Sequence, residues 1–213
     1  MKRGIDISHH NTITTLKGYD FVIIRAGYGS KGTDRKFKDH VKMAIDENIP
    51  FGLYWFLYAI TVDEAIQNAS RCIEVCSEYK DKMSLPLYSD YEYDSEKNAS
   101  GAISAQTRTN IVNMFNDAIQ AAGFRFGTYA NLDYLKNKFS STLRIGSLWY
   151  AQWNEDYNHR YKPDIWQFTN RLNGEDLDGN YLINENLLNG KETEPEPSFI
   201  CPVCKSRLQI VKA

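Results

Sequence analysis

The stretch Leu85-Pro-Leu-Tyr-Ser-Asp-Tyr-Glu-Tyr-Asp94 is the most informative part of the sequence for the fold, because it combines a buried strand with a cluster of acids. Its first half is apolar enough for a buried strand, and its second half carries acids at alternate positions, Asp90, Glu92 and Asp94. Residues i and i+2 of a strand face the same side, so Asp90 and Glu92 should project together from the strand's end. Two carboxyl groups on one face repel, and one then keeps its proton to higher pH. Such a proton suits acid-catalysed hydrolysis, while a solvated turn after the strand is the simpler alternative.

Short apolar segments alternate with amphipathic ones on both sides of this strand. Strands are predicted at residues 4–8, 21–26, 51–56, 87–92, 126–130, 148–151 and 165–168. Helices are predicted at residues 34–48, after the capping box Thr61-Val-Asp-Glu64, and at residues 104–122. This alternation predicts an α/β protein with a mainly parallel sheet. Because the later strands follow one another unevenly, an irregular TIM-like α/β barrel is favoured, with acidic residues at the carboxyl ends of its strands.

Each predicted helix has an apolar stripe that should face the sheet. The inward residues are expected to be Phe37, Val41, Ala44 and Ile45 in the first helix, Ala65, Ala69, Cys72 and Cys76 in the second, and Ile111, Phe115, Ala118 and Ala122 in the third. Cys72 and Cys76 are therefore expected to be buried thiols.

Composition limits the functions open to the chain. Its 213 residues, 42% hydrophobic and 24% charged, suit one main globular domain. A net charge of −2 provides no basic surface, so nucleic acid is not expected as a ligand. No apolar run approaches the roughly 18 residues of a membrane span, so stable membrane insertion is not expected. The first residues also lack an apolar run of signal-peptide length.

The end of the sequence differs in character from the rest. Residues 1–188 are predicted to form the main domain, 189–198 a polar linker, and 199–213 a tail too short for its own core. The tail contains Cys201-Pro-Val-Cys204, whose spacing suits one knuckle of a zinc site. A closed structural site needs four ligands, so three interpretations stay open: a thiol tail without metal, zinc shared by two chains of a homodimer, or a truncated ribbon.

A further acid interrupts the apolar segment Gly4-Ile-Asp-Ile-Ser8. Asp6 there is costly unless it is paired, hydrogen-bonded or at the wet end of the strand. If neighbouring strands place Asp6 opposite Glu92, the chain holds the two carboxyl groups that glycoside hydrolysis requires.

Six short motifs resemble, in order and spacing, the family 25 glycoside hydrolases, the Chalaropsis-type lysozymes. They are Gly4-Ile-Asp-Ile-Ser8, Phe21-Val-Ile-Ile-Arg-Ala26, Gly52-Leu-Tyr-Trp-Phe56, Asp90-Tyr-Glu92, Leu148-Trp-Tyr-Ala151 and Trp166-Gln-Phe-Thr169. The resemblance covers residues 1–188 and implies a flattened, irregular α/β barrel. It also implies an N-acetylmuramidase that needs no cofactor and cleaves the β-1,4 bond between N-acetylmuramic acid and N-acetylglucosamine in peptidoglycan with retention. Many members are phage endolysins, which implies a protein that waits in the host cytoplasm before it reaches the wall.

The resemblance also assigns roles to individual residues. Glu92 matches the family's general acid/base, Asp6 its second catalytic carboxylate and Asp90 a supporting acid. Whether the second acid attacks the sugar or orients the substrate's N-acetyl group stays open.

Three aromatic residues are expected to contact the substrate. Tyr129 matches a family tyrosine near the cleft, and Tyr54 and Trp153 are candidate platforms for sugar rings. Each of the three is also a candidate for packing in the core.

One position departs from the family pattern. The family commonly ends its barrel with an acid in a Gly-Asn-Val-Asp-Leu-Asn type strand, and Leu182 stands at that place in Gly179-Asn-Tyr-Leu-Ile-Asn184. Asp176, Asp178 or Glu185 could substitute. The departure motivates an alternative function, a wall-binding relative without catalytic activity.

Two other motifs are given simpler interpretations. Gly27-Tyr-Gly-Ser-Lys-Gly32 has the form of a dinucleotide fingerprint, but Asp34 opens the next helix where pyrophosphate would sit, so a flexible loop at the barrel rim is favoured over an NAD site. His9 and His10 are adjacent and have no partner at metal-ligand spacing, so a pair at the rim is favoured over a metal site.

Overall fold

A computed structural model describes residues 1–189, 199–200 and 207–208 of the chain. The strands are β1 Lys2–Ile7, β2 Phe21–Tyr28, β3 Gly32–Thr33, β4 Phe51–Phe56, β5 Leu87–Asp90, β6 Phe126–Asn131, β7 Ser147–Ala151, β8 Ile165–Thr169, β9 Asp178–Leu182, β10 Phe199–Ile200 and β11 Arg207–Leu208. The α-helices are α1 Phe37–Asp46, α2 Val62–Cys76 and α3 Ala105–Ala121. Short helical segments cover Ser77–Lys82, Tyr93–Glu96, Tyr134–Lys138, Leu172–Gly174 and Glu185–Asn189. The predicted zinc knuckle, Cys201 and Cys204, lies outside the described residues.

Eight strands close into a barrel because β1 pairs with both β2 and β9. The order around the barrel is β1, β2, β4, β5, β6, β7, β8 and β9, and β3 is attached to β2. Within the barrel, neighbouring strands are parallel, except that β9 runs antiparallel to β8 and β1. The predicted irregular α/β barrel is therefore confirmed. The carboxyl ends of its parallel strands meet at one edge, where such barrels place their active sites.

The core has two layers, which follow from the alternation of side chains along the strands. In β2, Phe21 and Ile23 face the barrel interior, which large rings such as Tyr88 and Trp149 fill. The intervening Val22 and Ile24 belong instead to the cluster that includes the buried helix residues. This strand is buried on both faces, which explains its unbroken apolar sequence.

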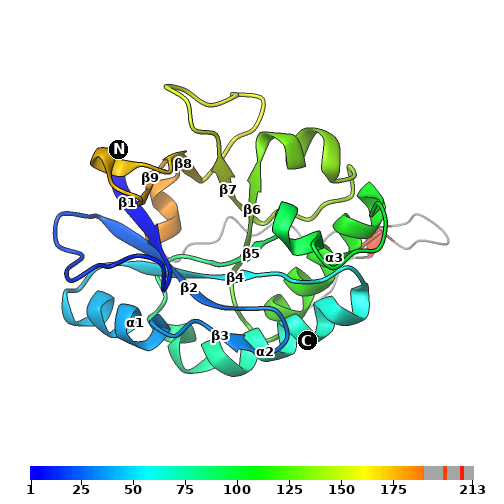
Figure 1. Cartoon of the computed structure of the whole chain (residues 1–213), viewed down its shortest axis with the longest axis horizontal. Coiled ribbons are helices and arrows are strands. Elements are labelled where there is room, and N and C mark those ends of the chain that lie inside the picture. Colours follow the sequence, from blue (N-terminus) through cyan, green and yellow to red (C-terminus); the bar gives the residue numbers. More distant parts are fainter. Residues whose placement is uncertain (190–198, 201–206, 209–213) are drawn as a thin grey trace.

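The helices cover one side of the barrel. α1 and α2 pack against β2, and α3 packs against β5, β6 and α2 (Figure 1). The predicted capping box opens α2: Glu64 donates its backbone N–H to Thr61 Oγ1 at 3.2 Å and accepts the Thr61 N–H at 3.2 Å. Most residues of the helical stripes are buried, and Ala118 and Ala122 are partly buried against the core. Ile45 is 43% exposed, so its predicted inward position is wrong. The buried stripe of α1 is turned toward His40, which leaves Ile45 at its edge.

Two strands of the nine-stranded sheet, β3 and β9, were not among the predicted elements, nor was the separate pair β10 and β11. β9 contains Gly179 and Asn180, residue types that are uncommon in strands. β3 returns along β2, so residues 27–32 form a hairpin rather than the flexible loop expected there. A Cβ at Gly27 would lie 2.5 Å from the Trp55 ring, so close packing, not phosphate binding, explains this glycine.

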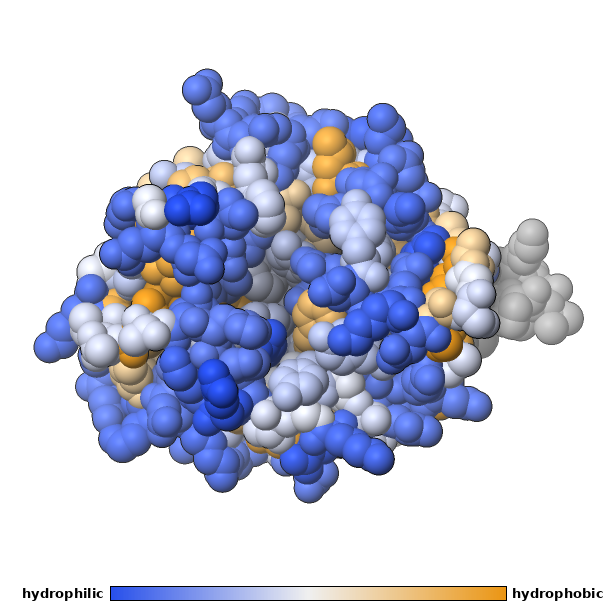
Figure 2. Space-filling view, viewed as in Figure 1, coloured by the Kyte–Doolittle hydropathy of each residue, from blue (hydrophilic) through white to orange (hydrophobic). Residues whose placement is uncertain are grey.

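The face of the molecule seen in Figure 2 is mostly hydrophilic, with apolar side chains in scattered groups. In the described part of the chain, no helix has the length and apolar character needed to cross a bilayer.

Candidate active site

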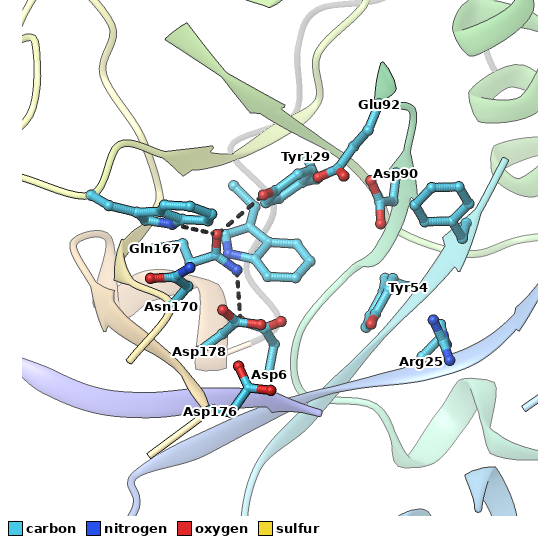
Figure 3. A pocket seen from close by; sticks show the side chains of 13 residues that line it. Asp6, Arg25, Tyr54, Asp90, Glu92, Tyr129, Gln167, Asn170, Asp176 and Asp178 are labelled. Atoms are coloured by element: carbon cyan, nitrogen blue, oxygen red, sulfur yellow. Dashed lines mark hydrogen bonds between the residues drawn. The ribbon is translucent and has the colours of Figure 1, made fainter. Parts of the chain in front are cut away.

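A cavity of about 330 Å³ opens at the carboxyl edge of the barrel (Figure 3). Its lining is rich in carboxyl, amide and aromatic groups. The lining residues are Asp6, Arg25, Tyr54, Phe56, Asp90, Glu92, Tyr129, Trp149, Trp153, Gln167, Asn170, Asp176 and Asp178. All six residues that the sequence nominated for catalysis or substrate contact are in this set.

Asp90 and Glu92 reach the cavity from the end of one strand. Asp90 is the last residue of β5, and Glu92 follows it with extended backbone, φ −128° and ψ −172°. The Glu92 N–H is donated to Ser95 Oγ at 2.9 Å, which fixes the turn into the next helical segment. The two carboxyl groups therefore point into the same space (Figure 3), whereas Asp94 is exposed and absent from the lining.

Asp6 lies opposite and is held by side-chain amides. Its Oδ2 accepts hydrogen bonds from Gln167 Nε2 at 2.9 Å and Asn180 Nδ2 at 2.7 Å. The Gln167 oxygen in turn accepts from the Tyr129 hydroxyl and from Trp153 Nε1, both at 3.1 Å. With two donors on its oxygen, the Gln167 side chain must turn its NH₂ toward Asp6.

A second acid accompanies Asp6. The register of β1 and β9 places Asp178 directly opposite Asp6, and the two carboxyl groups are hydrogen-bonded to each other. Asp176 also lines the cavity. Leu182, which stands where the family pattern has an acid, pairs with Lys2 at the other end of β9 and is fully buried in the barrel interior. A leucine at position 182 therefore does not reduce the number of acids in the cavity, where Asp178 lies beside Asp6.

The four facing carboxyl groups hold their protons more tightly than usual. Burial, then repulsion from Asp178, raises the pKa of Asp6 well above its ordinary value. Burial, then the charges of Glu92 and Asp6, does the same for the pKa of Asp90. Burial also raises the pKa of Glu92, against a hydrogen bond from Tyr129 that lowers it. Burial raises the pKa of Asp178 to about 6. Crowding of this kind is typical of catalytic acids.

The aromatic candidates are not equivalent. Tyr54 is 8% and Tyr129 7% exposed, and their rings pack edge-on against Trp149 at centroid distances of 5.7 and 4.6 Å. Both are walls of the cavity rather than open platforms. Trp153 is 54% exposed, so its ring remains available to a ligand.

Sequence reasoning missed several groups of this site. Gln167 lies inside a quoted motif, between Trp166 and Phe168, and strand alternation alone could have placed it on the inner face. Asp178 is one of the three acids that the sequence offered in place of Leu182, and only the register of β9 selects it; Asp176 also lines the cavity and Glu185 does not. Asn180 was not nominated, because its contact with Asp6 depends on the same register.

The histidine pair lies beside the cavity rather than in its lining. His9 Nδ1 is 3.0 Å from Asp34 Oδ2, and Arg25 Nη2 also contacts the His9 ring nitrogen. His10 is exposed. Within the described residues, no three His, Cys, Asp or Glu side chains are arranged to hold a metal ion.

Comparison with known proteins gives a family and several similar folds. The family model described as Glycosyl hydrolases family 25 matches residues 5–177. The modular autolysin LytC from Streptococcus pneumoniae, solved in complex with a synthetic peptidoglycan ligand, is 27% identical with a TM-score of 0.71. That match covers 84% of this chain and 46% of the autolysin, so the chain spans about half the length of LytC.

Two further structures share the fold over most of both chains. The catalytic domain of endolysin ply40 from bacteriophage P40 of Listeria monocytogenes is 23% identical, with a TM-score of 0.72 and coverage of 89% of this chain and 96% of that domain. The muramidase from Acremonium alcalophilum is 20% identical, with a TM-score of 0.74 and coverage of 90% and 100%. No curated protein sequence matches the chain significantly.

Proposed function

The chain belongs to the glycosyl hydrolases of family 25, and we propose that it hydrolyses bacterial peptidoglycan at the β-1,4 bond between N-acetylmuramic acid and N-acetylglucosamine. One observation carries the proposal furthest: Glu92 and Asp90 share a single cavity with Asp6 and Asp178. Glycoside hydrolysis needs one carboxyl group to protonate the leaving oxygen and another to support the positive charge that develops on the sugar.

Glu92 is the proposed general acid. Burial raises its pKa, so a larger share of the side chain is protonated near neutral pH than for an ordinary glutamate. After it gives up the proton, the Tyr129 hydroxyl can stabilise the carboxylate, which is why this contact lowers the pKa of Glu92. That hydroxyl has one hydrogen, so it serves either Gln167 or Glu92 at a given moment.

Asp90 is the proposed partner closest to the developing charge. In the described residues its Oδ1 is buried and accepts no hydrogen bond. A carboxylate with an unused oxygen at the cavity wall can turn it toward the sugar carbon or toward the N–H of the substrate's N-acetyl group. Either contact gains strength as positive charge appears in the transition state.

Asp6 is more firmly held than Asp90. The resemblance implies that Asp6 is the second catalytic carboxylate, but two amides already occupy its Oδ2 and Asp178 shares a hydrogen bond with it. We therefore propose that Asp6 and Asp178 act as a unit that shares one proton and positions the groups around it. Asp6→Asn should then retain more activity than Asp90→Asn in hydrolysis assays, and the opposite order would restore Asp6 as the principal partner.

Digestion of purified cell walls tests the function directly. Wild-type protein should clear the suspension, Glu92→Gln should not, and the new reducing ends should be N-acetylmuramic acid. Reducing N-acetylglucosamine would instead show that the other glycosidic bond is cut. Retention predicts that the β-anomer appears first in the NMR spectrum of early products; the α-anomer would contradict retention without affecting the assignment of the bond.

The same assay separates the enzyme from a wall-binding relative without activity. That alternative depended on Leu182, which lies at the end of β9 away from the cavity acids, so no observation now favours it. The likeness to an endolysin catalytic domain supports a setting in which the protein accumulates in the host cytoplasm and acts on the wall after release.

A further inference from the structure

Two aromatic side chains stand apart from the others. Among the phenylalanine, tyrosine and tryptophan side chains whose burial the structure describes, only Tyr93, at 56%, and Trp153, at 54%, are exposed. Both lie at the carboxyl edge of the barrel. Trp153 follows β7 and lines the cavity, and Tyr93 comes directly after Glu92. Exposed rings gathered beside a catalytic cavity are expected to contact a ligand.

Tyr93 is exposed and yet fixed in position. Its hydroxyl donates to Asp133 Oδ2 at 2.8 Å, and Asp133 is itself held by Asn137 Nδ2 at 2.7 Å. The Tyr93 ring rests edge-on against the buried Tyr134 ring, with the centroids 5.1 Å apart and the planes at 72°. Trp153 is tethered in the same way, through its N–H to Gln167. A side chain that is ordered before binding loses less entropy when a ligand arrives.

Packing alone does not explain why Tyr93 is there. The buried Tyr134 ring beneath it also packs against the rings of Phe139 and Tyr91, at centroid distances of 5.3 and 6.3 Å. The Tyr134 hydroxyl donates its own hydrogen bond to Glu96. With more than half of its surface in solvent, Tyr93 contributes little burial.

We propose that Tyr93 is a stacking platform for a sugar ring outside the cavity, on the side of the leaving group, and that the glycan strand is held between this platform and Trp153. The inference rests on the proposed function. If Glu92 protonates the leaving oxygen, the departing sugar and those beyond it lie on the Glu92 side of the cleaved bond, where Tyr93 is found. The apolar face of a pyranose ring matches a flat aromatic surface, and the phenol keeps its polar end on Asp133.

If Tyr93 is a platform, its removal should weaken glycan binding and raise KM for cleavage of long strands. The dissociation constant is measured by calorimetry for soluble glycan fragments of four and eight sugars, in a Glu92→Gln background that does not turn them over. Adding Tyr93→Ala should weaken binding of the octasaccharide about three- to tenfold, with a smaller effect on the tetrasaccharide. Tyr93→Phe should keep most of the affinity, and Asp133→Ala, which frees the phenol, should fall between them. Ile66→Ala, which truncates an apolar side chain 43% exposed on α2, is the matched control and should change neither constant.

The outcomes separate the two proposals. Equal octasaccharide affinity with and without Tyr93→Ala would overturn the platform, whatever the activity. Wild-type protein that cuts no peptidoglycan, yet loses glycan affinity through Tyr93→Ala, would overturn the proposed function and keep the platform. In an active enzyme, Tyr93→Ala should raise KM on long strands by a similar factor and lower kcat much less. The reverse pattern, a large loss of kcat with unchanged KM, would also exclude a platform.

Discussion

Two aspartates near the carboxyl edge of the barrel are almost equally buried and behave in opposite ways. Asp34 is 2% and Asp90 6% exposed. Asp34 accepts hydrogen bonds from Arg25 Nε at 2.8 Å, from the backbone N–H groups of His9 and Lys36, and lies 3.0 Å from the His9 ring nitrogen. Burial alone would raise the pKa of Asp34, but these donors outweigh it and the pKa is lowered. Asp90 faces Glu92 and Asp6, and burial, followed by the charges of these two acids, raises its pKa.

The difference shows that burial does not by itself mark a catalytic acid. Asp34 has a donor for each oxygen, and these donors fasten β1, β2 and the start of α1 together. Asp90 has acidic neighbours, and no group in the described part of the chain donates a hydrogen bond to its Oδ1; this arrangement costs stability and leaves the group available to substrate. Arg25 connects the two regions, since it pairs with Asp34 and also lines the cavity.

The largest expected effect separates activity from stability at Glu92. Glu92→Gln should lower the hydrolysis rate by about 10²- to 10⁴-fold, because it removes the transferable proton. Its free energy of unfolding should not fall, since the amide removes a charge that burial disfavours. Initial rates and urea denaturation measure the two quantities. A rate near wild type would contradict the assignment of Glu92 as the acid.

Asp34 should show the reverse behaviour. Asp34→Ala leaves the largely buried Arg25 without its carboxylate and should lower the free energy of unfolding by about 3 kcal/mol. Urea denaturation at neutral pH measures the loss, and Arg25→Met added to Asp34→Ala should recover part of it. If Asp34→Ala is as stable as wild type, the contrast between the two regions fails.

Asp178 offers a smaller, pH-dependent test. Its pKa is about 6, above the value of an unfolded aspartate. The free energy of unfolding is therefore higher at low pH, where Asp178 is protonated in both states, and this contribution is lost as the pH rises through about 6. Asp178→Asn cannot ionise, and it should be more stable than wild type by about 1 kcal/mol at pH 8, a value that allows for partial solvation of the carboxyl group. Below pH 4 the gain should vanish. Thermal unfolding across this range checks the trend; a gain that is largest at low pH would have the wrong sign.

The smallest effects should appear in the basic limb of the pH profile of kcat/KM. The Tyr129 hydroxyl lowers the pKa of Glu92, so Tyr129→Phe should move this limb to higher pH. Asp94 raises the pKa of Glu92 by its charge, so Asp94→Asn should move the limb slightly to lower pH. Shifts of both variants in the same direction would show that Glu92 does not set the limb.

The sequence predicts the parts of this molecule that rest on local patterns. Asp90 and Glu92 are found together because they follow a short apolar strand at alternate positions, and the capping box marks the start of α2 to the residue. Asp178 was named among three candidate acids, but a local pattern could not single it out. It depends on the antiparallel register between two strands more than 170 positions apart in the chain, where Asp6 faces Asp178. Ile45 shows a different limit, since an amphipathic pattern does not fix how far a helix is rotated about its axis.

The reversed direction of β9 also affects how the protein could be altered. A parallel neighbour must return across the whole barrel before the next strand begins, but the connection from β8 to β9 leaves and re-enters at the same edge, with Asn170 and Asp176 in its course. New residues inserted there would enlarge the rim without threading through the fold, and each doubling of the loop costs only about 0.6 kcal/mol in closure entropy. This hairpin is therefore a place where a grafted segment could change which wall polymers the cleft admits.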